Sequence, residues 1–237
     1  TDPAISRHKI PPQNSPSSLT TATGIALVWL IGFLVMLTSL MRDWLHTRAI
    51  VKAAILMDVS DLARQAGLPP DELKSAEFYI SNQTTIPFAT GIITPRVVLA
   101  MDTLQLNRES LQMVIRHELA HIRRRDMIWQ LICSLTVACN WYHPWVWIAN
   151  RLTQAEREQA CDDSVLLGGA NPDTYASVLL KHARKIASRN NQQSTAIAIA
   201  QPPLERRLTA ILDQGTCRQT GSNWQRLFPV LATATLV

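Results

Sequence analysis

The pentapeptide His117-Glu118-Leu119-Ala120-His121 lies inside residues 109–125, which have the apolar spacing of a single helix. Asn107 is placed to cap the start of that helix. The apolar residues that recur at the helical interval are Leu111, Val114, Ile115, Leu119 and Ile122. Residues four apart lie on one face of a helix, so His117 and His121 can present two imidazoles to one Zn²⁺.

Glu118 is the candidate general base of this motif. Its carboxylate can reach a metal-bound water without being a ligand itself. However, three fixed residues also occur by chance, and helix surfaces are rich in Glu and His. The pentapeptide alone therefore does not separate a metal site from an ordinary helix surface.

A second acidic element downstream strengthens the prediction. A catalytic zinc takes three protein ligands and leaves a fourth position open, so the two histidines need one more ligand. On a helix, Glu158 and Asp162 lie on one face, so Glu158 can be the third ligand and Asp162 can orient a ligating histidine. Glu156 is the rival ligand, but four residues after it stands Ala160 instead of an acid.

This combination resembles the membrane-embedded zinc metallopeptidases of the BlaR/MecR antirepressor type, in which H-E-x-x-H is followed by Glu-x-x-x-Asp on a later helix. The match covers most of residues 50–213, and this chain departs from the family pattern where His143-Pro144-Trp145 replaces an Asn-Pro pair before a Trp. The further matching segments are Pro87-Phe88-Ala89-Thr90-Gly91, Thr94-Pro95-Arg96-Val97-Val98-Leu99, His121-Ile122-Arg123-Arg124-Arg125-Asp126 and Leu204-Glu205-Arg206-Arg207-Leu208.

The resemblance implies a mainly helical α+β fold, in which a zincin-like (gluzincin-like) metallopeptidase domain with a small sheet is attached to transmembrane helices. It also implies one Zn²⁺ per chain and a signal-transducing protease that cleaves a protein or peptide in the cytoplasm, leading to loss of a transcriptional repressor. Two alternatives stay open: a housekeeping membrane metalloprotease, and a non-catalytic zinc-containing membrane scaffold. Glu118 counts against the scaffold, because a structural zinc site needs no general base.

Composition favours a membrane protein over a nucleic-acid-binding one. Hydrophobic residues make up 47% of the 237 residues and charged residues only 17%. The net charge of +5 comes from Lys and Arg beside apolar segments, without an aromatic-interleaved basic stripe, so no direct nucleic-acid partner is expected.

The four cysteines form no C-x-x-C pair, which fits a reducing compartment. Cys161 is either a thiol near the zinc or, as we favour, a small packed residue.

The apolar run of residues 19–41 contains no charge and is long enough to cross a bilayer. Arg42, Arg48 and Lys52 follow it, which by the positive-inside rule places a peptidase domain of residues 42–213 in the cytoplasm. Residues 1–18 are expected to be an extramembrane loop, 214–223 a linker and 224–237 the start of a second, truncated transmembrane helix. We therefore expect a fragment of a multi-pass protein of the inner (plasma) membrane.

Between the membrane run and the zinc helix, the sequence predicts one amphipathic helix at residues 47–65 and short strands at 77–80, 86–90 and 96–100. Pro87 cannot donate to a central ladder, so its strand is expected at an edge, where a substrate strand can pair. On the residues alone, an ordinary surface hairpin has equal weight. The residues assigned to substrate binding are Pro87, Phe88, Ala89, Thr90 and Gly91.

Residues 127–149 are apolar enough to suggest another membrane crossing. A full crossing would put Glu158 on the opposite side from His117 and His121, and the three could not share a metal. We therefore expect helices at 127–140 and 145–167 that form a hairpin against or into the membrane, followed by helices from Pro172 to about residue 186 and from Pro202 to Asp213. The candidates for oxyanion stabilisation are Tyr142, His143 and Arg116, with none singled out.

Overall fold

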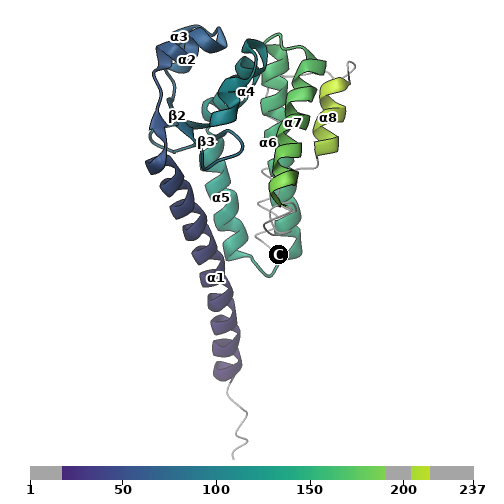
Figure 1. Ribbon diagram of the computed structural model, residues 1–237. Helices are drawn as coiled ribbons and strands as arrows, with labels where there is room; N and C mark the ends of the chain where they lie inside the picture. The colour runs from purple at the N-terminus through teal and green to yellow at the C-terminus, as the bar shows by residue number, and fades with distance from the viewer. Residues whose placement is uncertain (1–17, 191–203, 214–237) are drawn as a thin grey trace, which may run out of the picture.

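The computed structural model describes residues 18–190 and 204–213 of the chain. A long N-terminal helix, α1 (Ser18–Ala53), leads to a small sheet and a group of helices, with α5 (Asp126–Cys139) lying alongside α1 (Figure 1). The expected fold class is confirmed: the chain is mainly helical α+β with one small mixed sheet. The expected loop at residues 1–18 lies, except for Ser18, outside the described residues, as do the linker at 214–223 and the second membrane helix at 224–237.

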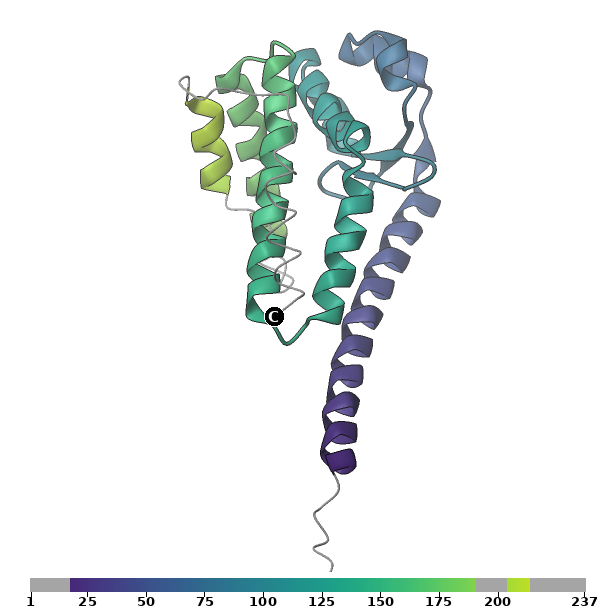
Figure 2. The same ribbon diagram turned by 180° about the vertical axis from the view of Figure 1, so that it is seen from behind.

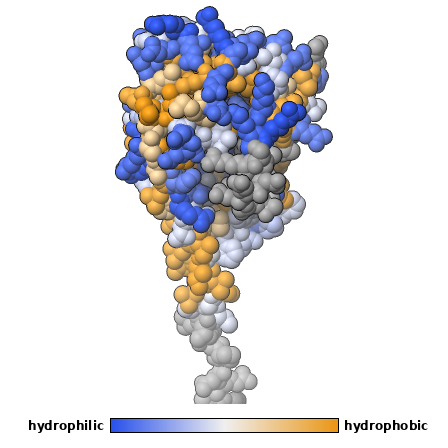
Figure 3. Space-filling view, in the orientation of Figure 1, coloured by the Kyte–Doolittle hydropathy of each residue, from blue (hydrophilic) through white to orange (hydrophobic). Residues whose placement is uncertain are grey.

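Helix α1 is, among the described residues, the one helix long and apolar enough to cross a membrane. Its apolar side chains are exposed, and they form the orange stem below the mainly blue upper part of the molecule (Figure 3). The prediction of a separate helix at residues 47–65 is wrong. Because nothing after Met41 breaks the helix, α1 continues to Ala53, where the chain turns to pair as β1 (Ile55–Leu56) before α2 (Val59–Ala66), which Asp58 caps.

The sheet has the strand order β1-β2-β4-β3, so β3 is an edge strand, as Pro87 predicts. Strands β2 (Glu77–Ser81) and β4 (Arg96–Ala100) are parallel, whereas β3 (Phe88–Thr90) runs antiparallel to β4. Helix α3 (Pro70–Leu73) precedes the sheet and a 3₁₀ turn (Met101–Gln105) follows it. The strand positions agree with prediction to within two residues.

The zinc helix of the prediction is α4 (Arg108–Arg123), and the Asn107 side chain caps it by accepting from the Ser110 N–H at 2.9 Å. Helix α4 lies between two apolar clusters, one shared with α2, α3 and the sheet, the other with α6 (Pro144–Leu167), α7 (Pro172–Asn190) and α8 (Leu204–Leu212). Helices α5 and α6 form a hairpin, so the chain returns to the side of α4, as the ligand argument requires (Figures 1 and 2).

Candidate active site

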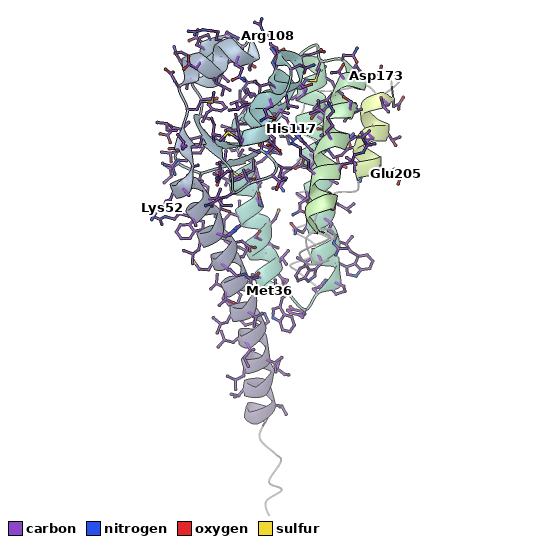
Figure 4. All side chains as sticks on the ribbon, in the orientation of Figure 1. Met36, Lys52, Arg108, His117, Asp173 and Glu205 are labelled. Atoms are coloured by element: carbon purple, nitrogen blue, oxygen red, sulfur yellow. The ribbon has the colours of Figure 1, made fainter. Side chains whose placement is uncertain are left out.

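Helices α4 and α6 bring the three predicted ligand residues together. The Nε2 atom of His117 lies 3.6 Å from one carboxylate oxygen of Glu158, and Nε2 of His121 lies 3.7 Å from the other. One donor atom from each of the three residues lies within 4.8 Å of the other two. Figure 4 shows His117 in the upper part of the molecule, where α4 faces α6 and α7.

Both histidines are oriented through their Nδ1 atoms, which leaves each Nε2 directed at Glu158. Nδ1 of His117 lies 3.2 Å from the Asp162 carboxylate and 2.9 Å from the Tyr175 hydroxyl, which itself donates to Asp162 at 2.6 Å. Nδ1 of His121 lies 2.9 Å from the Asp126 carboxylate. Carboxylate partners of this kind fix the ring and raise the basicity of a ligating histidine.

The donor set fits a tetrahedral zinc ion. Zinc-to-nitrogen and zinc-to-oxygen bonds of about 2.0–2.2 Å place neighbouring ligand atoms about 3.4 Å apart. The two measured separations, 3.6 and 3.7 Å, are close to that value. Three protein ligands with an open fourth position are the pattern of a catalytic site.

A second group of potential ligands, His121, Asp126 and Cys161, lies on the Nδ1 side of His121. Cys161 is fully buried, with its sulfur 3.3 Å from His121 Nδ1 and 3.7 Å from Asp126. Burial raises the pKa of this thiol well above its usual value, so without a metal ion it stays protonated. Its position fits the packed small residue that the sequence favoured.

Glu156, the rival ligand, points elsewhere. Its carboxylate accepts from Arg206 at 3.0 Å, and it is not part of the group formed by His117, His121 and Glu158. Residues two apart on a helix point in directions about 200° apart, so only one of Glu156 and Glu158 can face α4. The structure brings Glu158 to the histidines.

The charges of the site are strongly coupled. Burial opposes the charged form of His117, but hydrogen bonds with Asp162 and Glu158 outweigh it and raise the pKa of His117 to about 10. Burial likewise opposes ionised Glu158, yet the hydrogen bond with His117 and the nearby charges of His121 and Arg207 hold its pKa well below the usual range. The carboxylates therefore favour a positive charge at His117, and a metal ion bound there would displace the His117 proton.

Glu118 lies next to the three predicted ligands without joining them. It is only 8% exposed, and it lines the same cavity as His117, His121 and Glu158. Burial raises the pKa of Glu118, opposed by the charges of the two histidines. A carboxylate with a raised pKa is a stronger base and can take a proton from water in the cavity.

Arg207 of α8 joins the site from 45 residues beyond Asp162 in sequence. Its guanidinium donates to both Asp162 oxygens, at 2.8 and 2.7 Å, and lies 3.1 Å from Glu158. The Arg207 guanidinium therefore holds Asp162, the orienting acid, and Glu158, the predicted ligand, in one hydrogen-bonded network. Sequence reasoning gave no role to Arg207, Asp126 or Tyr175, although Arg207 and Asp126 stand in the segments that carry the family resemblance.

A cavity of about 290 Å³ opens beside the three predicted ligands and is bounded by β3 on one side and by α7 on the other. Of the predicted substrate-binding residues, Pro87, Phe88 and Ala89 line it. Thr90 continues the strand opposite Arg96. Gly91, at a positive φ of 89°, closes the next turn and borders a neighbouring hollow.

The candidates for oxyanion stabilisation lie away from this cavity. Tyr142 and His143 are at the turn between α5 and α6, and Arg116 donates to the Gly168 carbonyl at 3.0 Å. Instead, His182 of α7 lines the cavity. Burial and the nearby Lys185 lower the pKa of His182 to about 4, so at neutral pH it is an uncharged hydrogen-bonding group.

Comparison with known proteins gives relatives that each match part of this chain. Over 142 residues, 59% of this chain, it is 26% identical to the Regulatory protein BlaR1 of Bacillus licheniformis, of which it covers 24%. Over 145 residues, 60% of the chain, it is 21% identical to the Methicillin resistance mecR1 protein of Staphylococcus aureus, of which it covers 25%. A shorter match, 40% identical over 73 residues, covers 30% of the chain and 24% of a Protease HtpX homolog of Thermococcus kodakarensis.

The chain thus spans about a quarter of the length of these curated relatives. A family model described as BlaR1 peptidase M56 matches residues 1–211, which include every residue of the site described above. This chain belongs to the BlaR1 peptidase M56 family.

Proposed function

We propose that this chain is the catalytic part of a membrane-bound zinc metalloendopeptidase. The observation that carries the proposal is the convergence of His117, His121 and Glu158 beside a buried Glu118, at a cavity bordered by an edge strand. Membership of a peptidase family supports the same reaction. One Zn²⁺ per chain fits the donor set.

The bound ion would supply a Lewis acid and lower the pKa of a water at the open position towards about 7. Glu118 accepts a proton from the attacking water and passes it to the leaving amine. Asp162 and Asp126 hold the two imidazoles in their ligating orientation. Arg207 keeps Asp162 charged and in place.

The substrate is an extended protein segment. Strand β3 pairs with β4 on one side only, so its other edge is free, among the described strands, to accept a peptide strand by main-chain hydrogen bonds. Phe88 and Ala89 of that strand line the cavity beside the ligands. A peptide paired there would pass the three ligands and Glu118.

The similarity to BlaR1 and MecR1 supports a signal-transducing role of the antirepressor type. In this role the peptidase domain faces the cytoplasm from a multi-pass protein of the inner (plasma) membrane and cleaves a cytoplasmic regulator, such as a transcriptional repressor. The charge asymmetry around α1 supports that orientation, with Arg42, Arg48 and Lys52 following the apolar run. The partners are then the regulator and the lipid bilayer.

A second candidate is a housekeeping membrane protease, and the 40% identity over 73 residues to a Protease HtpX homolog supports a proteolytic role. The two functions differ in the number of substrates. A signalling protease cleaves one or a few regulators, whereas a housekeeping protease cleaves many membrane proteins.

The test is to sequence new protein N-termini in cells that express the wild-type chain or Glu118→Gln. The amide keeps the shape of the side chain but cannot act as a base, so every cleavage that depends on the chain should disappear while metal content stays near the wild type. Cleavages that are absent from cells without the chain but occur equally with the wild type and with Glu118→Gln would refute the role of Glu118. No cleavage that depends on the chain in either strain, with zinc present in both proteins, would favour the non-catalytic scaffold.

A further inference from the structure

The α5–α6 hairpin presents a continuous uncharged surface. No Asp, Glu, Lys or Arg occurs between Asp126 and Arg151, a stretch of 24 residues. Many of its large apolar side chains point outward, with Trp145 as much as 65% exposed. The others with large exposed fractions are Leu131, Ile132, Leu135, Tyr142, Trp147 and Ile148. A water-facing hairpin of this size would be expected to carry charge.

The tip of the hairpin is joined to α1 by two reciprocal hydrogen bonds. The Trp29 indole N–H donates to the Cys139 carbonyl at 3.0 Å, and the Trp141 indole N–H donates to the Trp29 carbonyl at 3.2 Å. The Trp141 ring also lies against Gly32, where any Cβ would overlap it. Figures 1 and 2 both show α5 running beside the half of α1 that is nearer the sheet.

These contacts fix the depth of the tip relative to the membrane helix. Arg42 is the first charged residue after the apolar run, and it stands 10 residues after Gly32 and 13 after Trp29. At 1.5 Å per residue, the contacts lie about 15 and 20 Å from Arg42 along α1. The hydrocarbon core of a bilayer is about 30 Å thick, so a bilayer that surrounds α1 also surrounds the tip.

We propose that the α5–α6 hairpin is a re-entrant membrane element, inserted beside α1 and covered by lipid acyl chains. This inference does not depend on the peptidase activity. The continuity of its apolar surface with that of α1 favours acyl chains as the covering.

Several polar groups of the turn at the tip are bonded internally, as the hydrocarbon interior requires. The Asn140 N–H and side-chain amide both donate to the Thr136 carbonyl at 3.0 Å, and the His143 N–H donates to the Asn140 carbonyl at 2.9 Å. The Trp147 indole donates to the Trp141 carbonyl at 2.9 Å. Arg151, the first charge on α6, lies 7 residues from Pro144 and can extend its side chain toward the headgroups.

The insertion of the hairpin determines where the catalytic cavity lies relative to the bilayer. Met127 and Gln130, at the start of α5, line that cavity, and the apolar hairpin surface begins with the next turn at Leu131. The cavity therefore lies at the membrane surface. The peptide bond to be cleaved therefore reaches the cavity in a substrate segment that lies close to the bilayer.

The experiment uses the whole chain in phosphatidylcholine vesicles that carry a diazirine in the acyl chain. After illumination, mass spectrometry should find lipid adducts on α1 and on residues 131–148, and none on the exposed face of α7. Adducts confined to α1 would overturn the proposal, whether water or another protein segment covers the hairpin.

A matched pair of lysine variants gives a second measurement in nanodiscs. Leu135 at the hairpin and Leu167 at the far end of α6 are 41% and 48% exposed. Leu135→Lys should lower the Tm by several degrees and Leu167→Lys should leave it unchanged, because only the first lysine enters hydrocarbon. Equal Tm values for the two variants would overturn the insertion.

Discussion

Replacing Asp126 by Asn should weaken metal binding although Asp126 is not a ligand. Its carboxylate is 1% exposed and lies 2.9 Å from His121 Nδ1, so it fixes the ring that turns Nε2 toward Glu158. Loss of an orienting partner of this kind costs about 10- to 100-fold in metal affinity, which is about 1.4–2.7 kcal/mol. A hydrogen bond to a charged group contributes about 1.5–3 kcal/mol, which gives the same range.

The assay is competition for zinc between the purified protein in detergent and a chromophoric chelator. Asp71→Asn is the matched control, because Asp71 is far from the site in sequence and forms an exposed ion pair with Lys74. It should bind zinc like the wild type. A zinc affinity for Asp126→Asn within twofold of the control would refute the orienting role. For His117, which has both Asp162 and Tyr175 at Nδ1, Tyr175→Phe should cost less than Asp126→Asn.

Other outcomes follow from the same contacts. Because burial raises the pKa of Glu118, kcat/KM should fall as pH decreases through a value above the usual 4.5 of a glutamate, and a pH profile measures it. Arg207→Met leaves Asp162 buried without its cation, which should destabilise the fold by about 3–5 kcal/mol in thermal unfolding, whereas Arg206→Met should cost at most about 1 kcal/mol. Gly32→Leu should separate α1 from the hairpin and lower the Tm, with Gly24→Leu, in open space, as control.

Local patterns explain what the sequence predicted well. The helical spacing around His117, the cap at Asn107 and the short strands are determined by neighbours along the chain, and the structure agrees with each. The choice of Glu158 over Glu156 rested on a four-residue spacing, and the structure brings Glu158 to the histidines. The hairpin followed from a topological requirement of the shared site.

The features that the sequence did not predict depend on contacts between segments that are distant in the chain. Arg207 meets Asp162 across 45 residues and Tyr175 meets His117 across 58, which no periodicity encodes. The end of α1 was placed too early because the sequence shows where the apolar run stops, not where the helix stops. Similarly, Tyr142 and His143 have suitable chemistry, but the length of α5 carries them to the far end of the hairpin.

The central claim is that His117, His121 and Glu158 hold one zinc ion, and the most direct measurement is zinc per chain in the detergent-purified protein. The wild type and Glu156→Ala should each contain about one zinc, and Glu158→Ala should lose most of it. Full zinc in Glu158→Ala, or none in the wild type, would contradict the three-ligand site.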